Sequence, residues 1–372
     1  MALKPLPATS ASVSEPIRVL VVDDSAVIRG MIARWVGEAG GFEVVCTASN
    51  GRMAVDMVER HKPEIVLLDI EMPEVDGLAA LPLIMRAHPA SKVIVISTLT
   101  KRNAQISLKC LSLGAADYLA KPESARSADA AMVFRRELLE KLRALGVTKR
   151  RQVRSAPAAS SVAAPILQAA SVPRSGSARP QCVLIGSSTG GPRAVERVLQ
   201  DFKPSLMDIP VLIVQHMPAM FTAVFAEHLQ ALLGVPCREP ADGEAIRAGT
   251  IFIAPGGRHM GVTMTGGKPS IRLSDGPPEN FCRPAVDVLF REAASVFGAA
   301  AVAVVLTGMG SDGTNGARHL LKVGATVIAQ DEASSIVWGM PGSVVKAGLA
   351  HDILPLDAIG RSMKGLIAGN TR

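Results

Sequence analysis

The chain has 372 residues, a length that favours two domains over one and excludes a peptide or a disulfide miniprotein. Hydrophobic residues make up 48% and aromatic residues only 3%, which argues against wholesale disorder and against the stacking surfaces of single-strand nucleic-acid binders. The formal net charge is +7, but residues 146–180 carry six basic and no acidic side chains. The excess lies on one segment, so it does not indicate a nucleic-acid partner.

Cysteine usage predicts the compartment. The five cysteines form no C-x-x-C pair, a pattern typical of reduced thiols rather than of a disulfide framework or a zinc site. The first 16 residues hold no apolar core of a signal peptide after Lys4, and the longest strongly apolar run, residues 296–306, is shorter than the roughly 20 residues of a membrane helix. We therefore expect a cytoplasmic protein with no direct membrane insertion.

The first half of the chain alternates short apolar runs with segments of helical periodicity. Runs buried on both faces and separated by helices predict a parallel sheet with helices on each side. We expect a doubly wound α/β domain over residues 17–145, after a disordered tail at residues 1–16. The predicted strands are residues 17–22, 43–48, 64–69, 92–97 and 117–120.

The composition then changes and changes back. Residues 146–180 hold eight Ala, six Ser and four Pro and no aromatic residue, which predicts a flexible linker. Alternation resumes at Gln181, so residues 181–372 are expected to form a second, mainly parallel α/β domain. Its predicted strands are residues 182–186, 211–215, 250–255, 301–308 and 325–330.

Acidic residues follow two strands of the first predicted sheet. Asp23 and Asp24 come after the first strand and Asp69 ends the third, and open α/β sheets bind ligands at that edge. Three converging carboxylates favour a Mg²⁺ ion among them. Asp69 would then act as a nucleophile towards a phosphoryl group, with Lys121 pairing with its oxygens and the Ser97 hydroxyl able to reach it.

An Asp-Asp pair alone could simply cap the following helix. The ordered segments VVDDS, LLDIEMPEVDG, VIS and YLAKP, however, resemble the receiver domain of bacterial response regulators over about residues 16–124. The resemblance implies that Asp69 is the phosphoacceptor and that Asp24, Asp69 and the backbone of Glu71 hold Mg²⁺. Ser97 would be the switch hydroxyl and Tyr118 the switch aromatic, although Tyr118 could equally be a half-buried strand residue.

The second domain opens with a candidate nucleophile. After the first strand, residues 186–190 fit G-x-S-x-G with Ser188 in the middle, a turn that exposes the hydroxyl. A Gly/Ser-rich turn before a helix could instead bind an anion through backbone amides. The segment lacks the lysine of a phosphate-binding P-loop and the glycine spacing of a dinucleotide fold, which weakens a nucleotide site.

A nucleophilic serine needs a base and an orienting acid. His216 ends an apolar strand at the same edge as Ser188, and His259, also expected at a strand end, is the reserve candidate. The remaining histidines of this domain are expected in helices or near the tail. Asp312, in a Gly-rich loop after another strand, is the candidate acid, and that loop could present amides to an oxyanion beside the Thr189 amide. The histidines set aside are His228, His319 and His351.

The segments IGSSTGGP, IVQHMP, FCRPAVDVLF, VVLTGMGSDG and WGMPG resemble the catalytic domain of the chemotaxis protein-glutamate methylesterases. The resemblance implies that Ser188 is the nucleophile, His216 the base and Asp312 the acid, with the Met309 amide in the oxyanion hole. This family more often has Ala where this chain has Ser187.

The same resemblance implies the partners and the control. The expected substrates are methyl-accepting chemotaxis receptors, whose glutamate methyl esters would be hydrolysed with release of methanol and whose glutamines would also be deamidated. The expected phosphodonor is a chemotaxis histidine kinase. Mg²⁺ would serve the receiver, and the hydrolysis would need no cofactor. The unphosphorylated receiver would hinder access to Ser188. The alternatives are a response regulator with a DNA-binding output or a non-catalytic receptor-binding output.

Overall fold

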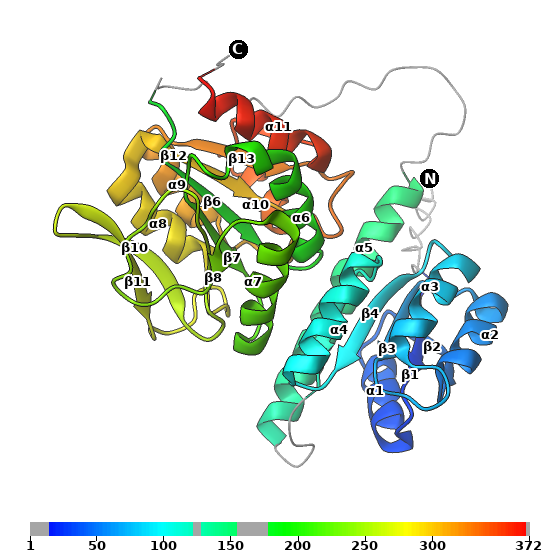
Figure 1. The fold of residues 1–372 in the computed structure, drawn as a ribbon. Helices are drawn as coiled ribbons and strands as arrows, with labels where there is room; N and C mark the ends of the chain where they lie inside the picture. Colours follow the sequence, from blue (N-terminus) through cyan, green and yellow to red (C-terminus); the bar gives the residue numbers. More distant parts are fainter. Residues whose placement is uncertain (1–14, 122–127, 155–177, 370–372) are drawn as a thin grey trace, which may run out of the picture. The chain divides into compact units, whose positions relative to one another are not determined.

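The computed structural model describes residues 15–121, 128–154 and 178–369. Its first sheet has five strands in the order β2-β1-β3-β4-β5, with helices between successive strands (Figure 1). The strands are β1 (Ile17–Val22), β2 (Phe42–Ala48), β3 (Ile65–Asp69), β4 (Lys92–Ser97) and β5 (Asp117–Ala120), and the helices are α1 (Ala26–Glu38), α2 (Gly51–His61), α3 (Gly77–Ala87), α4 (Lys101–Ser112) and α5 (Ala128–Arg154).

The second sheet has seven strands in the order β14-β13-β12-β6-β7-β9-β8, and neighbouring strands pair in parallel. Its strands are β6 (Cys182–Ser187), β7 (Val211–Gln215), β8 (Cys237–Arg238), β9 (Ile251–Ile253), β12 (Ala301–Val305), β13 (Thr326–Gln330) and β14 (Asp352–Leu354). Its helices are α6 (Gly191–Phe202), η1 (Lys203–Ser205), α7 (Ala219–Leu233), α8 (Val286–Phe297), η2 (Gly298–Ala300), α9 (Thr314–Lys322), α10 (Met340–Lys346) and α11 (Leu356–Ile367).

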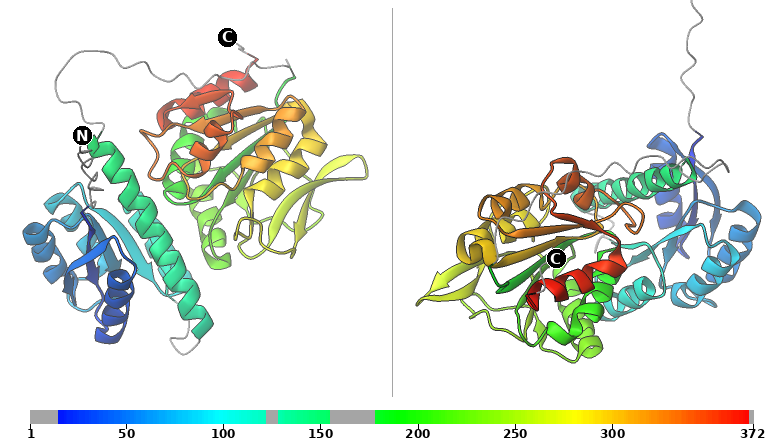
Figure 2. Two further views of the ribbon diagram at one scale, coloured as in Figure 1. Left: turned by 180° about the vertical axis from the view of Figure 1, so that it is seen from behind. Right: turned by 90° about the horizontal axis from the view of Figure 1, so that it is seen from above.

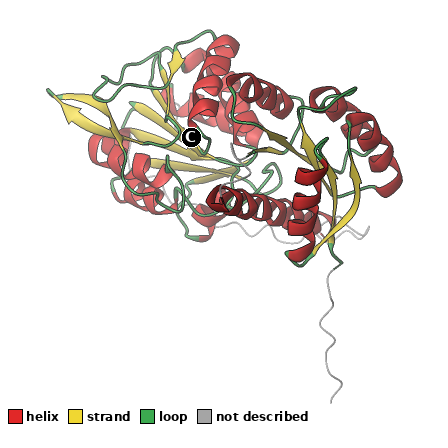
Figure 3. Cartoon of the chain, turned by 90° about the horizontal axis from the view of Figure 1, so that it is seen from below, coloured by secondary structure: helices red, strands yellow, loops and turns green. Residues whose placement is uncertain are grey.

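Both sheets contain strands that are buried between two layers of helices. Strands β3, β6, β7 and β12 are buried along their whole length, because helices cover both faces of each sheet (Figure 3). In the second sheet α6 packs against α11 and α8 packs against α9. The predicted fold class, two doubly wound α/β parts with mainly parallel sheets, is confirmed.

Three features differ from the expectations. Strands β8 and β14, at the two edges of the second sheet, were not among the predicted strands. The strands β10 (His259–Thr265) and β11 (Lys268–Ser274) form an antiparallel hairpin beside the second sheet, so His259 begins a strand and does not end one (Figure 2). Helix α5 continues to Arg154, so its last nine residues, 146–154, lie within the predicted linker. Residues 147–154 contain neither Gly nor Pro, so helical propensity carries the helix into the basic segment. The rest of the expected linker up to residue 177, and residues 1–14 of the expected tail, lie outside the described residues.

The strand order sets where ligands can bind. In the second sheet β6 lies between β12 and β7, and the chain runs outwards from β6 in both directions. Such a switch point opens a crevice at the carboxyl ends of the adjacent strands. The first sheet has the same feature at β1, which lies between β2 and β3. Among the described residues, no helix has the length and apolar character needed to cross a membrane.

Candidate active site

Three adjacent strands carry the three candidate residues of the second part. Ser188 follows β6, His216 follows β7, and Asp312 lies in the loop after β12. The His216 amide donates to the Ser187 carbonyl over 3.1 Å, which ties the ends of β7 and β6 together. The switch point therefore brings these candidates to one edge of the sheet.

The turn at Ser188 depends on small neighbours. The Ser188 amide donates to the Thr307 carbonyl over 3.0 Å, and the Gln215 side-chain amide donates to the Ser188 carbonyl, also over 3.0 Å. A Cβ added at Gly308 would lie 2.8 Å from Ser188 Cβ, so only glycine permits this approach. Gly190 has φ +74° where α6 begins. The half-buried Ser188 side chain is thus held on a sharp strand-to-helix turn.

Ser187 is in a different environment from Ser188. Its side chain is fully buried, and its hydroxyl donates to Gln215 Oε1 over 2.6 Å. This hydroxyl is occupied by a structural hydrogen bond inside the protein. Of the two adjacent serines, Ser188 is therefore the one with access to a substrate.

His216 pairs with Asp312 over 2.8 Å between Nε2 and Oδ2. A carboxylate accepts at this contact, so Nε2 carries the proton and Nδ1 is the ring atom that can accept one. Burial acts to lower the pKa of His216, but the hydrogen bonds to Asp312 and Cys282 outweigh it and raise the pKa above its ordinary value. In its neutral form the oriented imidazole directs its Nδ1 lone pair towards Cys282 Sγ, 3.6 Å away.

The Asp312 carboxylate, carried by the loop after β12, faces the first residues of α8. Oδ2 also accepts from the Val286 amide over 2.6 Å, and Oδ1 accepts from the Asp287 amide over 3.0 Å and from Asn280 Nδ2 over 3.1 Å. The positive end of the helix dipole therefore faces the carboxylate. Burial acts to raise the pKa of Asp312, but hydrogen bonds to His216 and these backbone amides hold the pKa below its usual value. Asp312 stays ionised and orients the ring.

No hydrogen bond joins Ser188 Oγ to His216 within the described part of the chain. His216 Nδ1 faces Cys282 Sγ at 3.6 Å instead. Catalytic hydrogen bonds are often long in free enzymes and tighten when substrate binds, so this geometry is compatible with a serine–histidine pair.

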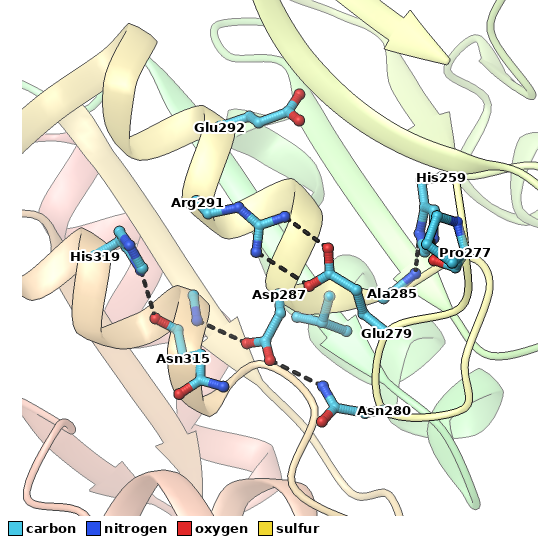
Figure 4. A network of polar contacts seen from close by, with 12 residues as sticks. His259, Pro277, Glu279, Asn280, Ala285, Asp287, Arg291, Glu292, Asn315 and His319 are labelled. Atoms are coloured by element: carbon cyan, nitrogen blue, oxygen red, sulfur yellow. Dashed lines mark hydrogen bonds and ion pairs between the residues drawn. The ribbon is translucent and has the colours of Figure 1, made fainter. Parts of the chain in front are cut away.

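The reserve histidine has a structural role. His259 Nδ1 accepts from the Ala285 amide over 3.2 Å, and Nε2 donates to the Pro277 carbonyl over 3.0 Å (Figure 4). Both ring nitrogens are occupied by backbone groups, and the side chain is buried. His259 therefore has no lone pair left for a base. As expected, His228 lies in α7 and His319 in α9, and His351 is buried before β14.

The candidate oxyanion donors lie on the two loops that flank Ser188. Thr189 follows Ser188 directly, and its carbonyl accepts from Thr307 Oγ1 over 2.9 Å. Met309 follows Gly308, whose amide donates to Val337 over 3.0 Å and whose carbonyl accepts from Met340 over 2.8 Å. The amides of Thr189 and Met309 donate to no other group in the described residues.

Sequence reasoning missed three supporting side chains. Gln215 bonds Ser187 and the Ser188 carbonyl, Asn280 bonds both Asp287 and Asp312, and Cys282 faces His216 (Figure 4 shows the Asn280–Asp287 contact). Gln215 stands beside His216 in the sequence, which is a usable signal. Asn280 and Cys282 precede the strand that carries Asp312, so only the folded loop reveals them.

The first sheet carries the acidic cluster. Asp23, Asp24 and Asp69 each offer a carboxylate oxygen within 4.8 Å of the others, and Asp23 and Asp69 are buried. Asp23 Oδ1 accepts from the Ser25 amide over 2.9 Å, and Ser25 is the N-cap of α1. Asp23 and Asp24 thus belong to one acidic cluster with Asp69, and the helix cap itself is supplied by Ser25.

The other receiver candidates lie at or beside strand ends. Ser97 ends β4, is buried, and its hydroxyl lies 3.0 Å from that of Ser107. Tyr118 in β5 is only 5% exposed, which is more buried than the alternative interpretation assumed, and burial raises the pKa of its phenol. The Lys121 amide donates to the Ser97 carbonyl over 2.7 Å. Glu71 is exposed, two residues after Asp69.

Comparison with known proteins identifies both parts of the chain. Residues 183–363 match the CheB methylesterase family and residues 19–132 match the response regulator receiver domain. A DNA-binding output is therefore wrong for the C-terminal part.

Two relatives from Rhodopseudomonas palustris are named protein-glutamate methylesterase/protein-glutamine glutaminase. The relative from strain HaA2 is 50% identical over 387 aligned residues, which cover 100% of this chain and 99% of the relative. The relative from strain CGA009 is 49% identical, with the same coverage. The crystal structure of the Thermotoga maritima CheB methylesterase catalytic domain is 39% identical and covers 51% of this chain and 98% of its own, with a TM-score of 0.48. With two full-length relatives at this identity, the chain belongs to the CheB family of protein-glutamate methylesterases, whose catalytic domain follows a receiver domain.

Proposed function

We propose that this chain hydrolyses glutamate methyl esters on methyl-accepting chemotaxis receptors, with Ser188 as nucleophile. The observation that carries the proposal is the His216–Asp312 pair of 2.8 Å at the sheet edge where Ser188 stands on its turn. A histidine held by a buried carboxylate is the arrangement that activates a serine hydroxyl. The relatives' names support a protein-glutamate methyl ester as the substrate, and the chemotaxis receptors are what the family resemblance implies.

Each step of the proposed hydrolysis uses a named atom of the site. Ser188 Oγ attacks the ester carbonyl carbon while His216 Nδ1 takes the hydroxyl proton, and the carboxylate of Asp312 stabilises the imidazolium. The amides of Thr189 and Met309 receive the oxyanion of the tetrahedral intermediate. Its collapse breaks the bond to the methoxy group, which leaves as methanol with the proton from His216.

Water completes the cycle. The acyl-enzyme is an ester between Ser188 and the glutamate side chain, and a water deprotonated by His216 attacks it to release glutamate. A glutamine side chain passes through the same intermediate with ammonia as the leaving group. We therefore propose that the chain also deamidates receptor glutamines, as the relatives' second name states of them.

The receiver part would carry the control. The three clustered carboxylates are oxygen donors, which fits Mg²⁺, and Asp24, Asp69 and the Glu71 backbone would hold it, with Asp23 beside them. Mg²⁺ would neutralise charge on the incoming phosphoryl group. Asp69 would accept that group from a chemotaxis histidine kinase, and Lys121 would pair with its oxygens.

Phosphorylation would raise the hydrolase rate. A phosphate on Asp69 can shift a conformational balance only by stabilising its states differently, and Ser97 and Tyr118 are the groups proposed to respond. The unphosphorylated receiver would hinder access to Ser188. Reduced thiols and the receptor and kinase partners support a cytoplasmic location for this reaction.

The test is methanol release from a methylated receptor fragment. Wild type should release methanol, whereas Ser188→Ala and His216→Ala should lose nearly all activity. Ser187→Ala is the matched control, because it removes a neighbouring hydroxyl that is buried. Turnover by Ser188→Ala close to that of wild type would overturn the proposal.

A further inference from the structure

A thiol and an imidazole face each other beside Ser188. Cys282 Sγ lies 3.6 Å from His216 Nδ1, and the Cys282 side chain is half-buried. The two residues are far apart in the sequence, so no spacing motif predicts the pair. None of the hydrolytic steps above uses the Cys282 thiol.

The loop holds Cys282 firmly in this place. The amides and carbonyls of Glu279 and Cys282 bond each other over 2.8 and 3.1 Å. The two central residues, Asn280 and Phe281, have φ of 52° and 62°, a tight turn with both central residues left-handed. Asn280 also bonds Asp287 and Asp312. The thiol is therefore fixed relative to the His216–Asp312 pair.

The His216 imidazole is oriented by a carboxylate, as the rings of metal-bound histidines usually are. Its Nε2–H donates to the Asp312 carboxylate over 2.8 Å, which leaves the Nδ1 lone pair pointing towards Cys282. Metal-ligating histidines usually donate their other ring N–H to a carboxylate or a carbonyl, which fixes the ring and raises its basicity.

The separation of the two donor atoms fits one metal ion. Zinc binds histidine nitrogen at about 2.0–2.1 Å and thiolate sulfur at about 2.3 Å with a tetrahedral angle, which places the two donors about 3.6 Å apart. The observed distance from Sγ to Nδ1 is 3.6 Å. His216, Cys282 and Asp312 also each offer a ligand atom within 4.8 Å of the others.

We propose that His216 and Cys282 form a binding site for a thiophilic divalent cation of the Zn²⁺ type, and that the bound ion inhibits the hydrolase. On binding, the Cys282 thiol loses its proton to solvent, a protonated His216 ring loses its Nδ1 proton to solvent as well, and the metal forms bonds to Sγ and Nδ1. Water completes the coordination. The lone pair that should accept the Ser188 proton is then taken by the metal. The inhibition, but not the binding, rests on the proposed role of His216.

Ligand chemistry separates this site from the receiver's acidic cluster. Thiolate and imidazole select zinc and its neighbours, whereas the all-oxygen set of Asp23, Asp24 and Asp69 suits Mg²⁺. Millimolar Mg²⁺ should therefore leave the His216–Cys282 site free, and inhibition by Zn²⁺ should persist in its presence.

Binding is tested with Co²⁺, whose bond to a thiolate gives a near-ultraviolet charge-transfer band. Full-length wild type in Mg²⁺ should develop the band, and Cys282→Ser and Cys282→Ala should lack it. The matched control is Cys46→Ser, which removes a half-buried thiol from β2 and should keep the band. A band of equal intensity in the two Cys282 variants would overturn the site.

Inhibition is tested with Zn²⁺ in the methanol assay, each variant being normalised to its own metal-free rate. Wild type and Cys46→Ser should be inhibited and recover with a chelator, and Cys282→Ser should need at least about tenfold more Zn²⁺. Equal sensitivity of Cys282→Ser and wild type would refute the proposed inhibition. A Co²⁺ band that depends on Cys282 without inhibition by Zn²⁺ would keep the binding site but refute His216 as the base, so the two failures are distinguishable.

Discussion

Replacing Asp312 by Asn keeps the shape of the side chain and removes its charge. In the structure Oδ2 accepts from His216 and the Val286 amide, and Oδ1 accepts from the Asp287 amide and Asn280. Asparagine has one acceptor oxygen and one NH₂ group, so one of these two sets of donors must face an NH₂ group. We expect Asp312→Asn to be folded but severely impaired in hydrolysis.

The expected loss of hydrolytic rate in Asp312→Asn follows from a change in the tautomer of His216. If the NH₂ group faces the ring, Nε2 must accept and the proton moves to Nδ1, which can then no longer accept from Ser188. Loss of the orienting carboxylate in serine hydrolase triads costs about 10⁴ in kcat. At about 1.4 kcal/mol per tenfold, this is a loss of about 5.5 kcal/mol of transition-state stabilisation.

The assay is steady-state methanol release from the methylated receptor fragment, with circular dichroism to verify folding. Asp287→Asn is the matched control, because Asp287 is also buried and accepts from Asn280 Nδ2 over 2.9 Å (Figure 4). Within the described residues, Asp287 makes no hydrogen bond to His216. We expect the control to stay within about tenfold of wild type. A folded Asp312→Asn protein that also stays within tenfold would refute the assigned role of Asp312.

Three further outcomes are expected. The rate of methanol release should increase with pH, with a midpoint above about 6.5, because the pKa of His216 is raised and only the neutral ring accepts a proton. A midpoint at or below about 6.5 would contradict the raised pKa. Ser187→Ala should stay active but lose about 1–3 kcal/mol of unfolding free energy in a denaturant titration, because Gln215 Oε1 loses its buried donor. Asp69→Asn should leave the rate unresponsive to a small-molecule phosphodonor with Mg²⁺, and a stimulated rate would place phosphorylation elsewhere.

Central strands such as β3 and β7 were predictable because they are buried on both faces and therefore appear as continuous apolar runs. The short strands β8 and β14 at the edges of the second sheet were not predicted. The hairpin β10/β11 was missed because its exposed half mixes polar and apolar residues. A signal was present in Gly266 and Gly267, whose φ values of +57° and +76° make the turn. The end of α5 at Arg154 was missed because composition averaged over a long window hides a local helix end.

The candidate site was predictable to the extent that it uses strand ends. Ser188, His216 and Asp312 each follow a predicted strand, and parallel strands bring their carboxyl ends to one edge. The sequence already favoured His216 over His259 as the base, and the structure adds that both ring nitrogens of His259 are bonded to backbone groups. The approach of Cys282 to His216 depends on a tight turn that the sequence did not reveal.

The central claim is that Ser188, activated by His216, is the nucleophile. Covalent labelling with a fluorophosphonate, followed by peptide mapping, tests it most directly, because the probe reacts with an activated serine hydroxyl. The account predicts one adduct on Ser188 in wild type, none in Ser188→Ala, and labelling slowed by orders of magnitude in His216→Ala. An adduct on Ser187, or methanol release by an enzyme that the probe never labels, would contradict it.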